Sequence, residues 1–322
     1  MKPPLLVATR GWNPQGWASR IRPLLPDRTI LCTERDGLFS GPDRDLAEVR
    51  YLLAWKPRPE TLDRLPALEA IFSLGAGVDH IFALSRLPDV PVVRIVDADL
   101  TGRMREYIVW QVLDHLRRGP AYRRLQAEHR WDEFAQPAAR EVAVGIMGFG
   151  VMGSAAAEIL LLLGFRLRGW TRSPKAASGV EMFSGPEGLD PFLAGTDVLV
   201  SLLPLTAETR GLVDGALLRK LSRSGPLGGP VFINAGRGGT HVEADLAEAL
   251  KDGTLAGASL DVFHQEPLAA DSPLWDFDDL IITPHVAAVS DPPALAAQIA
   301  EQINAYERGE PLRNRVDPGR GY

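Results

Sequence analysis

The stretch Gly148-Phe149-Gly150-Val151-Met152-Gly153 lies near the middle of the chain. An apolar run over 142–147 precedes it, and a helix-like segment follows through Leu163. A strand, a glycine turn and a helix in this order are what a dinucleotide site requires. The first glycine allows a tight turn, the second lets backbone approach a pyrophosphate, and the third lets helix pack on strand. The N–H groups that open the helix favour bound phosphates. The pattern predicts dinucleotide contacts at Gly148, Gly150, Val151, Met152 and Gly153.

Short apolar runs alternate with helix-like segments on both sides of the glycine turn. This alternation is typical of parallel α/β sheets. The expected strands lie at 5–8, 51–54, 70–73 and 92–95 before the turn, and at 166–170, 197–202, 231–235, 257–261 and 280–283 after it. Helices are expected over 104–117, 243–251 and 293–307.

A chain of 322 residues has room for about two domains. The chain is expected to cross between the domains at about 104 and 287, so we predict a flavodoxin-like α/β substrate domain over 1–103 and 287–322. A doubly wound Rossmann domain over 104–286 is expected as an insertion in it. Ligands bind at the carboxyl ends of the strands of such sheets, so the two domains would flank a crevice. Polar residues at strand ends are therefore the candidates for function.

The composition is that of a globular protein without a broad basic surface. Hydrophobic residues make up 45% of the chain, charged residues 24%, and the formal net charge is −6. The negative balance argues against nucleic acid as a partner, and no apolar run has the length of a membrane span. The first residues lack the pattern of a signal peptide. Cys32, the single cysteine, is expected to be a small buried hydrophobe, and its isolation favours a reducing, cytoplasmic location.

The residues after the second strand of the inserted domain indicate which cofactor binds. An NAD site places Asp or Glu about 20 residues past the glycine turn, where it accepts hydrogen bonds from the ribose hydroxyls. Here no acid occurs before Glu181. Cations and hydroxyls in that place attract a 2′-phosphate. We expect NADPH, with NADH as the alternative cofactor, although a solvated basic loop is the commoner fate of such residues. The expected contacts are Trp170, Thr171, Arg172, Ser173 and Lys175.

Arg237, Glu266 and His285 each follow an apolar strand, so we expect them to meet at the same edge of the sheet. Reduction of a 2-oxo acid needs a cation that holds the carboxylate and a donor that protonates the developing alkoxide. A histidine can donate that proton near neutral pH, and a neighbouring carboxylate orients the ring and raises its pKa. The other histidines show no metal-ligand spacing, so no metal site is expected.

The order of these elements resembles the D-2-hydroxyacid dehydrogenase family, whose catalytic Arg, Glu and His follow the glycine fingerprint in this order. The matching positions are Arg237, Glu266 and His285. The likeness extends to 73–79 and 203–206. Within the family the chain is most similar to a bacterial glyoxylate/hydroxypyruvate reductase branch that prefers NADPH. The stretches that carry this likeness are 104–107, 272–275, 283–288 and 320–322.

The resemblance also implies contacts that the residues alone do not establish. In the first domain, backbone N–H groups of Gly75, Ala76, Gly77 and Val78 would cradle the substrate carboxylate, together with Arg237. Trp55 would either limit the size of the substrate or act as a packing residue. The family also implies a homodimer, with 104–140 as the contact region. Further cofactor contacts would come from Leu203, Pro204, Thr206, Ala235, Gly236 and Asp261.

The implied reaction is hydride transfer from NADPH to glyoxylate or hydroxypyruvate, with His285 as the acid. Phosphoglycerate, 2-ketogluconate and phenylpyruvate dehydrogenases of the same family remain alternatives, because the sequence does not give the size of the pocket. Formate dehydrogenases carry Gln where Glu266 stands, which argues against that activity. A non-enzymatic NAD(H)-sensing regulator is the alternative from another functional class, and this chain lacks the long tails and basic runs expected of one.

Overall fold

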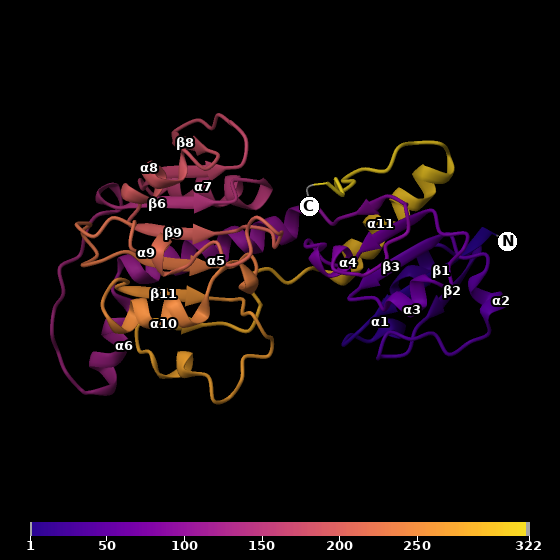
Figure 1. The fold of residues 1–322 in the computed structure, drawn as a ribbon, viewed down its shortest axis with the longest axis horizontal. Coiled ribbons are helices and arrows are strands. Elements are labelled where there is room, and N and C mark those ends of the chain that lie inside the picture. Colours follow the sequence, from indigo (N-terminus) through magenta and orange to yellow (C-terminus); the bar gives the residue numbers. More distant parts are fainter. Residues whose placement is uncertain (1, 320–322) are drawn as a thin grey trace. The chain divides into compact units, whose positions relative to one another are not determined.

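The computed structural model describes residues 2–319 and, within them, two compact units. The first unit combines residues up to Leu100 with those from Ser290 onward, and the second comprises Thr101–Val289. Because the first unit is built from both ends of the chain, the second is an insertion in it (Figure 1).

The first unit is a flavodoxin-like parallel sheet covered by helices. Its strands run in the order β2-β1-β3-β4-β5, and Leu5, Leu6 and Val7 on β1 are fully buried, as expected for a central strand covered on both faces. The elements are β1 (Lys2–Thr9), α1 (Pro14–Ile21), η1 (Arg22–Leu24), β2 (Arg28–Cys32), α2 (Asp43–Leu46), β3 (Tyr51–Trp55), α3 (Pro59–Leu62), β4 (Ala70–Ser73), α4 (Asp79–Phe82), β5 (Val92–Val93) and α11 (Pro292–Glu307).

Strand β2 was not expected from the sequence, because it begins with a charged residue that the fold buries. The Arg28 guanidinium pairs with Glu307 and lies 4.9 Å from the centre of the Tyr51 ring. The expectation that Cys32 is buried was wrong, since it has intermediate exposure at the end of this edge strand. Its Sγ lies 3.8 Å from the carbonyl oxygen of Pro14, and partial burial raises the pKa of the thiol.

The second unit is a doubly wound sheet, as the sequence predicted. Its parallel strands run in the order β12-β11-β10-β9-β6-β7-β8, so the chain reverses direction across the sheet between β6 and β9. Edge strand β8 was not expected, because its residues are half-buried or exposed and give no apolar run. The strands are β6 (Ala143–Met147), β7 (Arg166–Thr171), β8 (Val180–Ser184), β9 (Val198–Ser201), β10 (Val231–Asn234), β11 (Gly257–Leu260) and β12 (Leu280–Ile282).

Helices cover both faces of this sheet and produce two apolar cores (Figure 1). Alternate residues of each strand face opposite cores: Val198 and Val200 on β9 pack with α5 and α7, whereas Leu199 packs with α8, α9 and α10. Helix α5 begins earlier than expected, where the Asp97 carboxylate accepts from the N–H of Leu100. The helices are α5 (Ala98–Leu116), α6 (Gly119–Ala127), η2 (Ala139–Glu141), α7 (Val151–Leu162), α8 (Leu189–Ala194), α9 (Gly215–Leu218), η3 (Gly238–Thr240), α10 (Glu243–Lys251) and η4 (Pro273–Asp276).

Within residues 2–319, no helix combines the length and the apolar composition that crossing a membrane would take.

Helix α5 is joined to the sheet by a buried histidine that the fold keeps neutral. Nε2 of His115 lies 2.8 Å from the hydroxyl of Ser259 on β11, and burial lowers the pKa of His115 to about 4. Burial likewise lowers the pKa of His241 to about 4. The unfolded chain binds protons at these histidines below about pH 6.5. Their stabilising contribution is therefore complete above that pH and is lost as the pH falls toward 4.

We predict that the free energy of unfolding decreases by on the order of 2 kcal/mol for each of these histidines between pH 7 and pH 4.5. Urea unfolding at several pH values measures this slope. In His115→Gln the loss of stability over this range should be smaller by about the contribution of one histidine, whereas replacing the exposed histidine in His129→Asn should leave it unchanged. A variant His115→Gln with the full slope would contradict the assignment.

Candidate active site

The three glycines of the fingerprint have distinct structural roles. Gly148 has a φ of +90°, and a Cβ there would lie 2.6 Å from the carbonyl oxygen of Leu202. Gly153 brings α7 onto the turn, since its Cβ would lie 2.5 Å from the oxygen of Gly148. At Gly150, the N-cap of α7, no described atom lies within 4 Å of an added Cβ. A tight turn, open space and the first N–H groups of a helix are what a dinucleotide pyrophosphate needs.

The same point of the sheet also holds the loop that carries Arg237. A Cβ on Gly236 would lie 2.7 Å from the oxygen of Leu203, so the loops after β9 and β10 pack backbone to backbone. Asn234 shapes the second loop: its Oδ1 accepts from the N–H of Gly236 at 3.0 Å, and its amide donates to the oxygen of Arg237 at 3.2 Å. Buried Leu203 and Ala235, with half-buried Pro204 and Thr206, complete the predicted contacts of this region.

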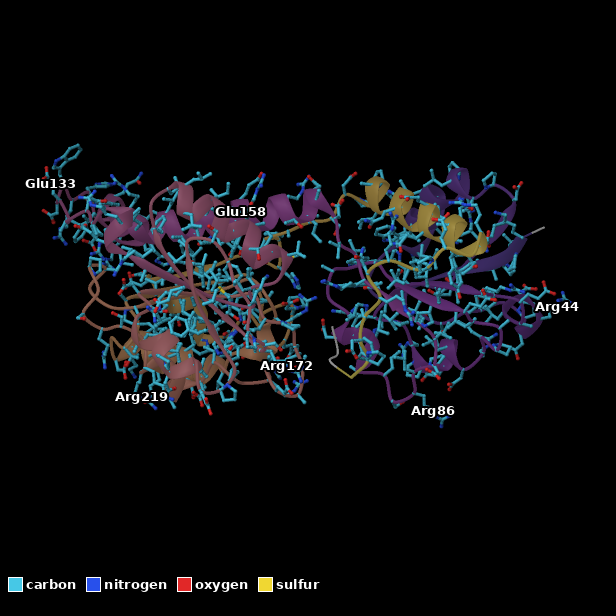
Figure 2. All side chains as sticks on the ribbon, turned by 90° about the horizontal axis from the view of Figure 1, so that it is seen from above. Arg44, Arg86, Glu133, Glu158, Arg172 and Arg219 are labelled. Atoms are coloured by element: carbon cyan, nitrogen blue, oxygen red, sulfur yellow. The ribbon has the colours of Figure 1, made fainter. Side chains whose placement is uncertain are left out.

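The loop that follows β7 carries Arg172 and Lys175, and we refer to it as the basic loop. It lies next to the glycine turn. Nζ of Lys175 donates to the oxygen of Phe149 at 2.8 Å. Arg172 is exposed (Figure 2) and pairs with Glu208, 3.1 Å away on the loop after β9. Inside the basic loop, the Thr171 hydroxyl donates to the oxygen of Ser173 at 2.8 Å. The indole N–H of Trp170 is already used within the fold, because it donates to the oxygen of Gly185 at 2.9 Å.

Glu266 and His285 form the hydrogen-bonded pair that the sequence predicted to be close. Oε2 of Glu266 lies 2.8 Å from Nδ1 of His285, and its Oε1 accepts from the N–H of Phe263 at 3.1 Å. His285 adopts a φ of 56°, an uncommon conformation for a residue with a side chain. A Cβ on Gly238 would lie 2.0 Å from the backbone of Phe263, so the loop of Arg237 packs against the loop of Glu266.

Asp261 organises the loop that carries His285. Its side chain is almost fully buried, and its two oxygens accept from the N–H groups of Val286 at 2.8 Å and Ala287 at 2.9 Å. The Thr283 hydroxyl donates to the same carboxylate at 2.7 Å and lies 2.8 Å from the hydroxyl of Tyr107. Burial raises the pKa of Tyr107. Tyr107 and Thr283 were not predicted as site residues, although both lie in stretches that carry the family resemblance, 104–107 and 283–288.

In the first unit, the predicted carboxylate cradle follows β4. The Ser73 hydroxyl accepts from the N–H of Gly75 at 3.2 Å and lies 2.8 Å from its oxygen, so one amide of the cradle is already used within the loop. Gly75 is required sterically, because a Cβ would lie 2.4 Å from the Trp55 ring. Trp55 in turn stacks on Trp12 with ring centres 4.3 Å apart. The loop residues from Gly75 to Gly77 are half-buried, and Val78 is buried.

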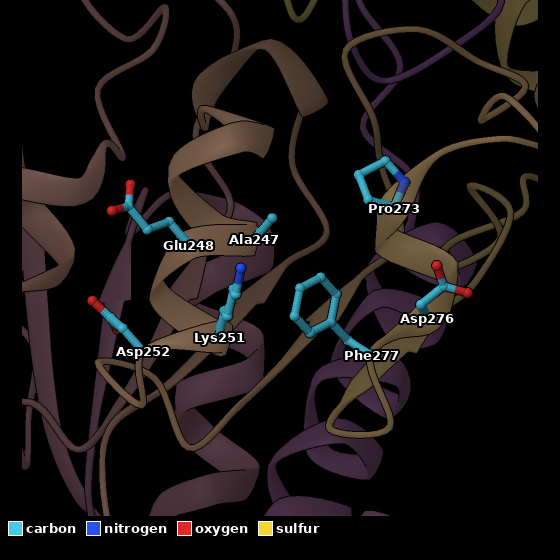
Figure 3. A pocket seen from close by; sticks show the side chains of 7 residues that line it. All are labelled: Ala247, Glu248, Lys251, Asp252, Pro273, Asp276 and Phe277. Carbon is cyan, nitrogen blue, oxygen red and sulfur yellow. The ribbon is translucent and has the colours of Figure 1, made fainter.

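One cavity of the second unit lies beside the segment that follows His285, and another lies apart from the candidate site. One of about 780 Å³ opens between α10 and η4 and contains none of the predicted site residues (Figure 3). Another of about 340 Å³ lies between α5 and the segment that follows His285, and it is lined by Tyr107, Trp110, Val286 and Val289 among others.

Comparisons with known proteins establish the family of this chain. The sequence model of the D-isomer specific 2-hydroxyacid dehydrogenase NAD binding domain matches residues 109–287. Glyoxylate/hydroxypyruvate reductase A of Escherichia fergusonii is 43% identical over 95% of this chain and 96% of its own length. The chain belongs to the D-isomer-specific 2-hydroxyacid dehydrogenase family.

Solved structures of similar dehydrogenases have the same fold over their whole length. A probable 2-hydroxyacid dehydrogenase from Rhizobium etli, in complex with NADP, HEPES and L(+)-tartaric acid, is 46% identical with a TM-score of 0.93. An NADPH-dependent glyoxylate/hydroxypyruvate reductase from Sinorhizobium meliloti, in complex with NADP and sulfate, is 47% identical with a TM-score of 0.92. Each comparison covers 100% of both chains.

We predict that Asp261→Asn destabilises this dehydrogenase by about 1–3 kcal/mol, because an amide would set an N–H donor against backbone N–H donors in a buried site. Urea unfolding followed by circular dichroism measures the loss. The exposed acid in Asp278→Asn provides the matched control and should change stability little. Equal stability of the two variants would show that the Asp261 carboxylate does not hold this loop.

Proposed function

We propose that this dehydrogenase reduces small 2-oxo acids with NADPH, converting glyoxylate to glycolate and hydroxypyruvate to D-glycerate. The observation that carries the proposal is the hydrogen-bonded pair of His285 and Glu266, 2.8 Å apart, on loops that follow adjacent strands. Similar proteins named glyoxylate/hydroxypyruvate reductase A support the choice of substrates. An acid at position 266 also separates this chain from a formate dehydrogenase, which donates no proton to its substrate.

The glycine turn supports the binding of a dinucleotide, and the basic loop supports its 2′-phosphate. Gly148, Gly150 and Gly153 would hold the pyrophosphate, with Arg172 and Lys175 on the 2′-phosphate. When bound, NADPH supplies the hydride. Similar solved structures contain NADP or NADPH, which supports the same preference here.

His285 acts in this proposal as the proton donor to the carbonyl oxygen of the substrate, through Nε2. Glu266 accepts from Nδ1–H, which fixes the orientation of the ring and its tautomer. Arg237 holds the substrate carboxylate and stabilises the negative charge that develops on oxygen. Asp261 positions His285 through the backbone and does not touch the reacting atoms.

We assign substrate binding to the first domain, predicted over 1–103 and 287–322, and dinucleotide binding to the second, predicted over 104–286. The compact units observed differ from these bounds by three residues at each crossing. In the first domain, the backbone N–H groups of Ala76, Gly77 and Val78 would cradle the substrate carboxylate, because the amide of Gly75 is bonded to Ser73. The stacked ring of Trp55 would limit the size of the substrate. The single cysteine is consistent with the cytoplasmic location that we propose.

A second copy of this chain is the partner that we propose, with the contact over 104–140. Exposed aromatic side chains in this region support it: Trp131 is 96% exposed, Trp110 52% and Phe134 37%. Exposed aromatic residues are enriched at protein interfaces, where their burial contributes much of the binding energy.

We predict that His285→Asn lowers turnover at least 10²-fold, because a positioned proton donor contributes about that much. Asparagine tolerates the positive φ of this position, so the loop should keep its conformation. Loss of absorbance at 340 nm with NADPH and glyoxylate measures turnover, and calorimetry should show unchanged NADPH affinity. Replacing the exposed histidine in His264→Asn is the control. Near wild-type turnover in His285→Asn would refute the assignment, and no turnover of any 2-oxo acid by the wild type would refute the function.

We predict that Trp131→Ser weakens dimerisation about tenfold or more, because a buried aromatic anchor is typically worth at least about 2 kcal/mol at an interface. Light scattering during gel filtration should give the wild type twice the 35.0 kDa mass of the chain. Trp275→Ser, which removes an exposed tryptophan from η4, is the control and should leave the mass unchanged. A monomeric wild type would contradict the dimer itself.

A further inference from the structure

The two cations of the basic loop differ in the charge of their partners. Nζ of Lys175 contacts neutral groups, namely the oxygen of Phe149 at 2.8 Å and the hydroxyl of Ser154 at 3.4 Å. Its charge is therefore not compensated by these partners. The guanidinium of Arg172 instead lies 3.1 Å from the carboxylate of Glu208. Glu208 thus partly neutralises one of the two cations assigned to the 2′-phosphate.

Glu208 lies in a hydrogen-bonded turn after β9. The N–H of Thr206 donates to the Thr209 hydroxyl at 2.8 Å, and this hydroxyl donates to the oxygen of Pro204 at 2.6 Å. The N–H of Arg210 closes the turn on the oxygen of Thr206 at 3.0 Å. These bonds fix the backbone on both sides of Glu208, and its carboxylate lies 3.1 Å from the Arg172 guanidinium.

We propose that Glu208 is a specificity-determining residue that competes with the 2′-phosphate of NADPH for Arg172. The inference rests on the proposed NADPH preference. A phosphate that approaches Arg172 must displace or share the carboxylate, and the two anions repel each other. NADH has an uncharged hydroxyl in that place, so its binding is much less sensitive to the carboxylate. Glu208 therefore lowers the preference for NADPH over NADH below the value that the two cations alone would give.

The test compares the affinities of NADPH and NADH for the wild type and Glu208→Gln by calorimetry at low ionic strength. The neutral variant should bind NADPH about threefold to fivefold more tightly, as expected from the strength of an exposed ion pair, and NADH less than twofold more tightly. Glu208→Lys should increase the gain further. The control is Glu181→Gln, because Glu181 is an exposed acid that pairs with Arg168 on β7 at 2.5 Å. It should leave both affinities unchanged.

Two further measurements separate competition from a structural effect. The gain in Glu208→Gln should shrink as salt is raised, since exposed charges are screened. It should also become smaller in an Arg172→Ala background, where the carboxylate has no guanidinium to neutralise and only its direct repulsion of the phosphate remains. Arg172→Ala alone should weaken NADPH far more than NADH.

The outcomes distinguish failure of the role assigned to Glu208 from failure of the proposed NADPH preference. If the wild type binds NADPH no more tightly than NADH and Arg172→Ala changes nothing, the NADPH assignment fails. If Arg172→Ala removes an NADPH preference while Glu208→Gln equals the wild type, only the role of Glu208 fails. Equal gains for both cofactors, or weaker NADPH binding in Glu208→Gln, would also overturn the role of Glu208.

Discussion

The contact on which the second unit depends is the backbone packing at the reversal of strand order. Gly148 lies against the oxygen of Leu202, and Gly236 lies against the backbone of Leu203. A side chain at either glycine would push the end of β6 or β10 away from β9, which lies between them. The turn that opens α7 and the loop that carries Arg237 are thus held against one short segment. The two loops that we propose to contact cofactor and substrate therefore pack against the same backbone segment.

A series of hydrogen bonds links the end of β10 to His285. Main-chain bonds continue beyond the strand ends, from the N–H of Asp261 to the oxygen of Asn234 at 3.0 Å and from the N–H of His285 to the oxygen of Asp261 at 2.8 Å. The buried carboxylate of Asp261 then holds the residues that follow His285. These bonds maintain the positive φ of His285, because an uncommon conformation persists where its surroundings determine it.

Most of the fold could be predicted because it follows from apolar periodicity and glycine spacing. Apart from β7, which contains Arg166 and Arg168, the central strands of both sheets are mainly apolar runs, and they were expected within a few residues of their observed bounds. Strands β2 and β8 were missed because each mixes polar or charged residues with apolar ones, as with Arg28 in β2 and Glu181 in β8, and so gives no apolar run. The other two edge strands, β5 and β12, are apolar and were expected. The sequence order alone does not reveal that Arg28 is buried against Glu307, 279 positions away.

The candidate site was likewise predictable only in part. The pairing of Glu266 with His285 was predicted because strand ends of a parallel sheet meet at one edge. The bonds of Thr283 and Asp261 were not predicted, because hydroxyls and buried carboxylates have no spacing rule. Glu208 was missed for a related reason: a lone acid in a polar loop is ordinarily solvated, and its pairing with Arg172 depends on how two loops fold.

Substitutions in the residues proposed to set cofactor preference should affect stability less than substitutions in the residues that position His285. Arg172 and Glu208 are both about half exposed or more, so exchanging either should alter stability by no more than about 1 kcal/mol. The groups that position His285 are buried, and removing one leaves unsatisfied donors at a cost of about 1–3 kcal/mol. Under the proposed roles of Arg172 and Glu208, selectivity for the 2′-phosphate is therefore set by exposed side chains, and changing them leaves the sheet, the glycine turn and the loop of His285 undisturbed. A few exposed charges would then decide which nicotinamide cofactor this fold prefers.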